Sequence, residues 1–385
     1  MTNQYAVIDT ETSIIDKGHP FNPKANLVVT GIMPCDKDWN QTERTIYIYN
    51  NNYLEKILSE FKVILLHNAK FDLHHIRRVT GLCFDGLHIR DSQYAEFLLT
   101  NQTQVMPSLD SIALKYLNEQ KLDIVKTEFW NKGIDTDSIP RNILESYLEK
   151  DLDLTRRCYK IQEKLLREQE KLALYKLGCA DLKVLADMEY NGIYYDKETS
   201  LKKATELDEK LNSLRKNISS YATIPDFNIN SGDHLSLLLY GGVYRYDVKF
   251  PIEVYKTGKN VGEPRYKILE QTIDCLRLVD PPDRSELKKE GFFSTDEGTL
   301  LSIKTKDKKI KQLIQDILSY SKIEKLKGTY YLGIPKLMET KGWTNNILHG
   351  QLNQCVARTG RLSSSQPNQQ NFDPAAKQLC RSRYD

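Results

Sequence analysis

The chain has 385 residues, of which 40% are hydrophobic and 28% are charged, and its formal net charge is +3. This composition is typical of a folded protein of two or three domains and excludes a disordered chain. No apolar run approaches the roughly 20 residues that cross a bilayer, and residues 1–10 do not form a signal peptide. Seven scattered cysteines without CxxC spacing argue against a zinc site or a disulfide framework. We therefore expect a cytoplasmic protein that does not associate with membranes.

The charge is unevenly distributed along the chain. Residues 300–385 carry 15 Lys and Arg against 6 Asp and Glu, so residues 1–299 are acidic overall. A basic end joined to a mildly acidic front suits a protein that holds a polyanion with one part and cuts or reads it with another. A lysine-rich surface that is merely solvated is the alternative, and charge alone does not separate the two.

The first 172 residues predict an α/β layer with a mixed sheet, because three strands in a meander are followed by helix–strand–helix units. Hydrophobic patterns predict strands over 5–9, 27–33, 44–49 and 62–66, and helices over 51–60, from 69 and over 108–118. One long helix is expected from Pro140 to about residue 172, with Asp137 or Ser138 as its N-cap.

The rest of the chain has a different character. Residues 173–222 predict amphipathic helices with a turn at Asn191-Gly192, and a helix hairpin or bundle fits this stretch better than more sheet. Residues 241–293 alternate short β-like runs with Gly and Pro, which indicates a lobe inserted between helices. Helix returns near 296–327, and the last 35 residues are polar.

Four acidic residues on these elements can meet at one cleft. In the run AVIDTET, Asp9 and Glu11 are two residues apart on a strand and therefore share a face. Asp72 lies in the opening turn of a helix that follows a buried strand. Asp151 lies on the long helix, and Tyr147 is four residues earlier on the same face.

Clustered carboxylates raise one another's pKa unless cations neutralise them, and oxygen ligands favour Mg²⁺ or Mn²⁺. Two such ions roughly 4 Å apart are a common device for cutting phosphodiesters, and a tyrosine phenol could orient the attacking water. Each motif alone also has an ordinary interpretation, as a surface pair on a strand or a helix-capping aspartate. Together, in this order and on these elements, they favour a nuclease site.

The segments DTE, HNAKFD and YLEKD resemble the three exonuclease motifs of the DEDD superfamily. With a tyrosine four residues before the last aspartate, the third motif resembles that of the DEDDy branch, to which the proofreading domain of family A DNA polymerases belongs. The resemblance implies a ribonuclease H-like fold and a metal-dependent 3′–5′ exonuclease with two Mg²⁺ or Mn²⁺ ions. It implies metal-ligand roles for Asp9, Glu11, Asp72 and Asp151, a water-positioning role for Tyr147, and contacts of Asn68 and Phe71 with the 3′-terminal nucleotide.

A second resemblance lies near the end of the chain. Residues 358–371, RTGRLSSSQPNQQN, resemble TGRLSS-x-PNLQN, which joins thumb to palm in family A polymerases and grips primer–template. The match implies DNA contacts for Arg358, Arg361, Asn368 and Gln370, with Arg361 at the minor groove. Gln369 and the pair Phe372-Asp373 depart from the family pattern.

The two resemblances imply a domain order. An exonuclease over 1–172 would be followed by a mostly helical thumb over 173–343, with the lobe 241–293 inserted, and by the first palm segment over 344–385. The palm's catalytic motifs and the fingers helix have no match in these residues. We therefore expect DNA as a partner, both single-stranded 3′ ends and primer–template, together with a separate polypeptide that carries the rest of palm and fingers. If a phage encodes the chain, its location would be the host cytoplasm.

Three alternatives stay open at this point. The chain could be a truncated polymerase instead of a natural split subunit. It could be a free-standing DEDDy nuclease of the ribonuclease D type, although such an enzyme needs no primer–template grip. It could also be a DNA-binding half of a split polymerase without catalytic activity, against which the complete set of acids and Tyr147 counts.

Overall fold

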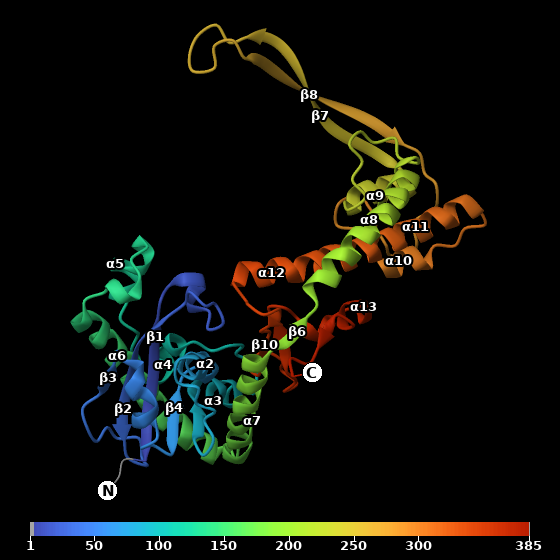
Figure 1. Ribbon diagram of the computed structural model, residues 1–385. Coiled ribbons are helices and arrows are strands. Elements are labelled where there is room, and N and C mark those ends of the chain that lie inside the picture. Colours follow the sequence, from blue (N-terminus) through green and yellow to red (C-terminus); the bar gives the residue numbers. More distant parts are fainter. Residues whose placement is uncertain (1–3, 385) are drawn as a thin grey trace. The chain divides into compact units, whose positions relative to one another are not determined.

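The computed structural model describes residues 4–384 and divides the chain into two compact units (Figure 1). Unit 1 runs to Lys197 and resumes at Ile334, and unit 2 is Glu198–Gly333. Unit 2 is therefore inserted into unit 1 along the sequence. The functional domains expected over 1–172, 173–343 and 344–385 remain predictions beside this division.

Unit 1 is built on a mixed five-stranded sheet, as the hydrophobic pattern predicted. Its strand order is β3-β2-β1-β4-β5, with β1, β2 and β3 antiparallel and β1, β4 and β5 parallel. The strands are β1 (Tyr5–Thr12), β2 (Leu27–Cys35), β3 (Ile46–Ile48), β4 (Val63–Leu66) and β5 (His88–Asp91). All four expected strands are confirmed, and β5 is an addition to them.

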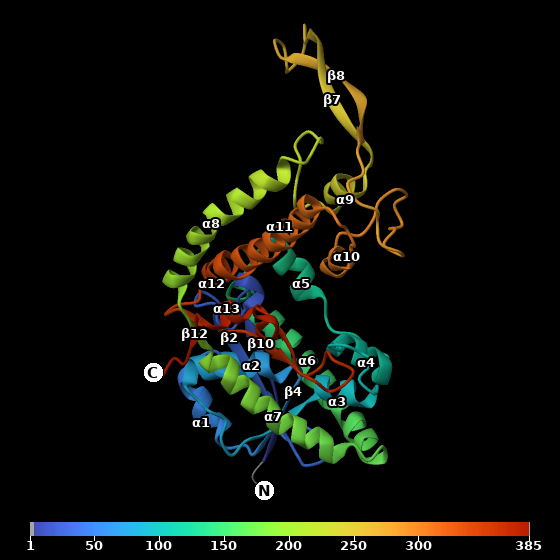
Figure 2. The same ribbon diagram turned by 90° about the vertical axis from the view of Figure 1, so that its right-hand side faces the viewer.

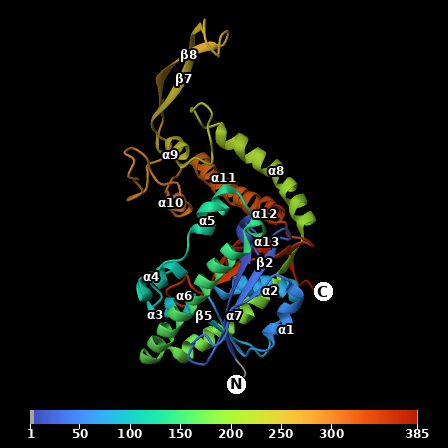
Figure 3. The ribbon, with the colours of Figure 1, turned by 90° about the vertical axis from the view of Figure 1, so that its left-hand side faces the viewer.

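Helices cover both faces of this sheet, because the strand residues are apolar on both sides. On one face Val7 and Leu65 pack into a core shared with α3 (Ser92–Leu99) and α6 (Arg141–Glu168). On the other face Ala6 and Ile8 pack against α1 (Leu54–Leu58) and α2 (Ala69–Thr80). The long helix α6 runs beside β2 (Figure 3). Alternate residues of β1 thus face different helices.

The long helix begins differently from the prediction. Pro140 is the N-cap of α6 and supplies no side-chain hydrogen bond, so neither Asp137 nor Ser138 caps it. Both residues lie in a 3-10 turn over Thr136–Ser138, where the Ser138 hydroxyl donates to Asp137 Oδ1 at 3.0 Å. The capping prediction was wrong because these side chains are satisfied within their own turn.

The turn at Asn191-Gly192 is confirmed, but a strand follows it. Helix α7 (Leu172–Asn191) ends at Gly192, whose φ is 64°. Strand β6 (Ile193–Tyr195) then pairs with β9 (Ile347–Leu348) and β12 (Cys380–Arg381) in a three-stranded sheet. The expectation of helices without sheet was wrong here, since the partner strands lie about 150 residues or more further along the chain and leave no local signal.

Unit 1 holds further short elements. They are α4 (Leu109–Leu117), α5 (Ile124–Glu128), most of α12 (Gly333–Lys341), β10 (Gln351–Asn353), β11 (Ser363–Ser365) and α13 (Pro374–Lys377). The helix predicted over 108–118 is confirmed by α4. Between residues 4 and 384 no helix is both long and apolar enough to cross a bilayer. The seven cysteines are all free thiols.

Unit 2 has a helical core. Its helices are α8 (Lys197–Ser219), α9 (Gly232–Tyr240), α10 (Glu297–Ser302) and α11 (Lys308–Lys325), and a π-helical turn (Leu326–Leu332) follows. Helices α8 and α11 lie side by side (Figure 2), and Arg215 donates to the Tyr320 hydroxyl at 3.0 Å. Leu239 and Ile317 are fully buried between the helices. A helical region over 296–327 is confirmed, with a break between α10 and α11.

The predicted lobe consists of two parts. Strands β7 (Gly242–Val254) and β8 (Pro264–Cys275) form one antiparallel hairpin, which extends away from the helices of its unit (Figure 1). No residue of 242–275 is buried. The return segment differs, because Leu278, Val279 and Phe293 pack against the helical core. We call residues 242–275 the arm.

Candidate active site

The three exonuclease-like motifs converge at one end of β1. Ligand atoms of Asp9, Glu11 and Asp151 all lie within 4.8 Å of one another. They line a cleft of about 460 Å³, to which Asp72 and Tyr147 also contribute. All five residues that the sequence singled out for catalysis therefore meet, although β1 and α6 contribute residues that lie more than 130 positions apart in the chain.

Because side chains alternate along β1, its residues reach both faces of the sheet at the cleft. Asp9 and Glu11 follow Val7 on the face that α6 covers, while Thr10 points to the opposite face. There the Thr10 backbone N–H and hydroxyl donate to Asp72 Oδ1, at 3.0 Å and 2.6 Å. One strand thus presents two carboxylates and holds a third in place.

A glycine on the neighbouring strand lets α6 come close to the sheet. Gly31 of β2 pairs with Asp9 of β1. A Cβ atom at Gly31 would lie 2.8 Å from the Leu148 side chain and 2.9 Å from that of Leu152, closer than carbon atoms approach without strain. The absent side chain therefore permits the contact that brings Asp151, on the same helix, to the end of β1.

The raised pKa values of the buried carboxyl groups indicate that the cleft favours a bound cation. Burial, with the charge of Asp151, raises the pKa of Asp9 to about 7. Burial and then the charge of Asp9 raise the pKa of both Glu11 and Asp72 well above their ordinary values. Asp151 Oδ1 is buried and has no hydrogen-bond partner among the described residues. Such a set of oxygen ligands fits a hard divalent ion, which would satisfy that atom and neutralise the charges.

The phenol of Tyr147 faces this acidic cluster. Its side chain is 7% exposed, and its ring meets that of Trp130 edge-on at 5.9 Å between centroids. Burial and then the charge of Asp151 raise the pKa of Tyr147, so the hydroxyl keeps its proton at neutral pH. Tyr147 can therefore donate a hydrogen bond to a water molecule in the cleft, but it is not a base.

Several cleft residues escaped the sequence analysis. Lys121 forms an ion pair with Asp151 Oδ2, and its ammonium lies 5.3 Å from the centroid of the Tyr147 ring. His67 also lines the cleft, and burial lowers its pKa to about 3, so it is neutral. Trp130 and Lys121 come from the loop-rich stretch between α4 and α6, where no periodic pattern or motif indicated a role.

The two residues expected at the 3′-terminal nucleotide lie at the start of α2. Phe71 lines the cleft. Asn68 is the N-cap, in the left-handed conformation with φ 59° and ψ 53°, and is not among the cleft-lining residues. Asp91 at the end of β5 accepts a hydrogen bond from the Ala69 N–H at 2.8 Å, which holds this turn. The sequence analysis missed Asp91 because it did not predict β5, the strand that ends at this residue.

The residues expected to grip DNA lie elsewhere in unit 1. Arg358, Arg361, Asn368 and Gln370 are exposed and do not line the acidic cleft. They follow β10, which pairs with β11 through Gln351–Asn353 and Ser363–Ser365. The Gln370 side chain donates to the Leu362 carbonyl at 3.0 Å, while the other three are solvent-facing.

Comparison with known families agrees with this geometry. A family described as 3′–5′ exonuclease matches residues 4–170, which include all five catalytic candidates. A second family, DNA polymerase family A, matches residues 266–383. The chain is thus similar to an exonuclease family in its first part and to DNA polymerase family A in its last part. The exonuclease match spans the five-stranded sheet, α2 and α6, and the polymerase match includes the basic end of the chain.

Individual relatives show how much of such a polymerase the chain covers. DNA polymerase I of Borreliella burgdorferi is 28% identical in an alignment of 384 positions that covers 96% of this chain and 35% of that protein. The DNA polymerase of Escherichia phage T5 is 28% identical in an alignment of 227 positions that covers 52% of this chain and 26% of that protein. The chain thus spans about a third of the curated relatives it matches.

A solved structure shares the fold. The POL domain of Pol1 from M. smegmatis, in complex with DNA primer–template and dNTP, has a TM-score of 0.65 and 17% identity to this chain. The similarity covers 97% of this chain and 53% of that one. The shared fold agrees with the expected architecture, an α/β domain followed by a mainly helical region.

Proposed function

We propose that this chain is the 3′–5′ exonuclease and primer–template-gripping part of a family A DNA polymerase, acting in DNA replication by removing nucleotides from 3′ ends. The observation that carries the proposal is the meeting of Asp9, Glu11 and Asp151 within 4.8 Å in a cleft also lined by Asp72 and Tyr147. The match of residues 4–170 to the exonuclease family supports it. A ribonuclease H-like topology is part of the proposal.

The metal site would hold two Mg²⁺ or Mn²⁺ ions on Asp9, Glu11, Asp72 and Asp151. Bound there, the ions would activate a water molecule and stabilise the charge on the departing oxygen. The buried, unpartnered Oδ1 of Asp151 and the raised pKa of Asp9 both favour cation binding. Thr10 holds Asp72 through two hydrogen bonds, so this ligand needs little reorganisation.

In the reaction, the oxygen of a water molecule forms a bond to the terminal phosphorus while the bond from phosphorus to the 3′ oxygen breaks. The 3′ oxygen takes up a proton, and a 5′-mononucleotide leaves. Tyr147 keeps its phenol proton and donates a hydrogen bond that orients the water. Phe71 supplies an apolar surface at the cleft for the terminal base.

DNA beyond the cleft would contact the basic end of the chain. Arg358, Arg361, Asn368 and Gln370 are exposed and polar, as a surface for phosphates and minor-groove acceptors must be. The M. smegmatis relative in complex with primer–template supports this role. A polypeptide carrying the rest of palm and fingers is a further proposed partner, and the match of residues 266–383 to DNA polymerase family A supports it.

The test uses a 5′-labelled primer–template with a mismatched 3′ end, Mg²⁺ and all four deoxynucleotides. The chain alone should shorten the primer one nucleotide at a time, and a chelator should stop the reaction. Primer extension by this chain would contradict the proposal, and so would shortening that persists in the chelator. Intact primer in the presence of tight DNA binding would favour a binding role without catalysis.

A further inference from the structure

Lys121 lines the cleft but has no role in the function proposed above. Lys121 pairs with Asp151, and its side chain is 26% exposed, so it reaches the cleft from the protein surface. Two lysines line the cleft in the described part of the chain, and the second, Lys17, is exposed and has no ion pair with the cleft acids. Lys121 is therefore the ammonium that contacts the acidic cluster directly.

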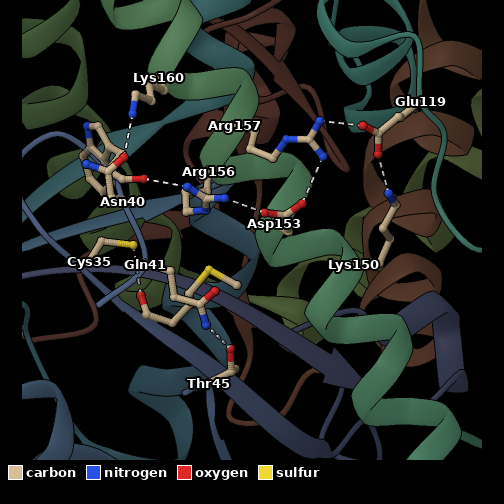
Figure 4. A network of polar contacts seen from close by, with 12 residues as sticks. Cys35, Asn40, Gln41, Thr45, Glu119, Lys150, Asp153, Arg156, Arg157 and Lys160 are labelled. Carbon is tan, nitrogen blue, oxygen red and sulfur yellow. Dashed lines mark hydrogen bonds and ion pairs between the residues drawn. The ribbon is translucent and has the colours of Figure 1, made fainter. Parts of the chain in front are cut away.

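Other contacts also hold the segment that carries Lys121. Two residues earlier, Glu119 accepts from Lys150 and Arg157 of α6, each at 2.5 Å, on the side of the helix shown in Figure 4. The backbone N–H of Lys121 donates to Asp110 Oδ1 at 2.9 Å. The main chain around Lys121 is thus held by Glu119 and by Asp110, through contacts that lie outside the cleft. These contacts place the lysine side chain next to Asp151.

The chemistry of the substrate gives that side chain a task. A phosphodiester carries a negative charge, and the four carboxylates of the cleft repel it. An ammonium beside Asp151 and Tyr147 offsets this repulsion, and it stabilises the additional negative charge that the phosphoryl oxygens gain in the transition state. A divalent ion bound by Asp151 competes with Lys121 for the same carboxylate, so metal binding makes the ammonium available to a phosphate.

We propose that Lys121 is a catalytic residue of the exonuclease that binds a non-bridging oxygen of the terminal phosphodiester. In the absence of metal Lys121 pairs with Asp151, and it therefore competes with an incoming divalent ion for this carboxylate. This inference rests on the proposed exonuclease function. It makes two separate claims that can be measured, one on metal affinity without DNA and one on turnover with DNA.

The first measurement is Mn²⁺ binding to the metal-free protein, followed by electron paramagnetic resonance of the free ion. Lys121→Met should bind Mn²⁺ roughly ten-fold more tightly than the wild type, because the competing ammonium is gone. Lys115→Met is a matched control: Lys115 pairs with buried Glu96 at 2.6 Å and lies 4.8 Å from the Tyr116 ring centroid, but it is not a cleft residue. Its Mn²⁺ affinity should equal that of the wild type.

The second measurement is single-turnover shortening of a labelled single-stranded oligonucleotide at saturating Mg²⁺. Lys121→Met should lower the rate on the order of 100-fold, and Lys121→Arg should recover part of it, since a guanidinium also binds phosphate. Lys115→Met should cleave at the wild-type rate. Thermal melting of each variant separates loss of function from loss of fold.

The outcomes separate the proposed role of Lys121 from the proposed exonuclease function. Equal cleavage rates for Lys121→Met and the wild type would overturn the role of Lys121 and leave the exonuclease intact. Unchanged or weaker Mn²⁺ binding by a folded Lys121→Met protein would overturn the competition for Asp151. A wild-type protein that binds Mn²⁺ and leaves the oligonucleotide whole would instead refute the proposed exonuclease function.

Discussion

The acidic cleft of unit 1 and the arm of unit 2 differ in how their residues are held. In the cleft, other elements hold the catalytic candidates: Thr10 of β1 donates to Asp72, and α6, which carries Tyr147 and Asp151, packs against Gly31 of β2. In the arm, β7 and β8 pair only with each other, and none of the residues 242–275 is buried. A two-stranded hairpin without a covered face contributes little to the stability of a fold.

This difference indicates where small changes matter. In the cleft, one atom added or removed alters both the packing and the charge balance, because buried groups have no solvent to compensate. In the arm, a side chain can be replaced with little effect on stability, because the residues are not buried and water can solvate the groups that lose a contact.

Removal of a carboxylate from the cluster should nearly abolish cleavage. Asp9→Ala or Asp151→Ala removes a proposed metal ligand and should cost several kcal/mol of transition-state stabilisation, or roughly 1,000-fold or more in rate. Single-turnover digestion of a labelled oligonucleotide measures the loss. Undiminished digestion by Asp9→Ala would remove the cleft from consideration as the site.

A side chain at the β2–α6 contact should act on the same site without touching it. Gly31→Val would push Leu148 and Leu152 away from the sheet and should cost about 1–3 kcal/mol of unfolding free energy. Because Asp151 moves with α6, cleavage should fall as well. Gly328→Ala is the control, since nothing lies within 4 Å of the atom it adds. Denaturant unfolding and cleavage assays would be run in parallel, and wild-type behaviour of Gly31→Val would show that α6 tolerates displacement.

Loss of the Tyr147 hydroxyl should be milder than loss of a ligand. Tyr147→Phe keeps the ring against Trp130 and should lower the rate roughly ten-fold, because only the orientation of the water suffers. The pH–rate profile should keep its form, since the phenol is protonated across the neutral range. A profile that loses an inflection in the variant would instead assign Tyr147 an acid–base role.

The raised carboxylate pKa values predict how the metal-free protein responds to pH. Asp9 has a folded-state pKa of about 7 against an ordinary value of 3.8, so the folded protein holds a proton between these values that the unfolded chain has released. Stability in chelator should therefore increase as the pH falls from 8 toward 5, and it should be lost as the pH rises through 7. Melting temperatures measure this slope, and Asp9→Asn should flatten it. A melting temperature that rises with pH over this range would contradict the buried charge cluster.

Removal of the arm should change cleavage least. Gly242 and Cys275 pair across the base of the hairpin, so a Gly-Ser turn can replace residues 243–274 without stretching the chain. The rate on single-stranded oligonucleotides should stay within about two-fold, and the unfolding free energy within about 1 kcal/mol. Duplex DNA binding should weaken if the arm is an accessory contact, which a filter-binding titration measures. Loss of cleavage on short oligonucleotides would make the arm part of the catalytic body.

The sequence alone predicted the sheet and the acids because both depend on local patterns. Strand alternation around Val7 and the spacing of Asp9 and Glu11 are readable within a few residues, and so is the four-residue step from Tyr147 to Asp151. A family resemblance then united segments that no local pattern connects.

What the sequence did not reveal depends on contacts between distant segments. Lys121 reaches Asp151 from a loop without periodicity, and β6 becomes a strand only because residues near 347 and 380 pair with it. The lobe was expected as several short runs, but cross-strand pairing extends them into two strands of 13 and 12 residues. Such pairing depends on partners that a single strand does not specify.

The three-stranded sheet of β6, β9 and β12 also sets an order of events during synthesis. Tyr195 at the end of β6 pairs with Cys380, so the central strand leaves the ribosome long before either of its neighbours. Strand β9, the first neighbour to be made, follows β6 by about 150 residues, so at about 5–20 residues per second the delay is roughly 8–30 seconds. Both edges of β6 are unpaired throughout that interval, while the whole of unit 2 is made and can fold. The three-stranded sheet of unit 1 can therefore form only after the whole of unit 2 has been synthesised. A nascent chain halted before residue 347 would expose both edges of β6, which could then pair with a wrong strand.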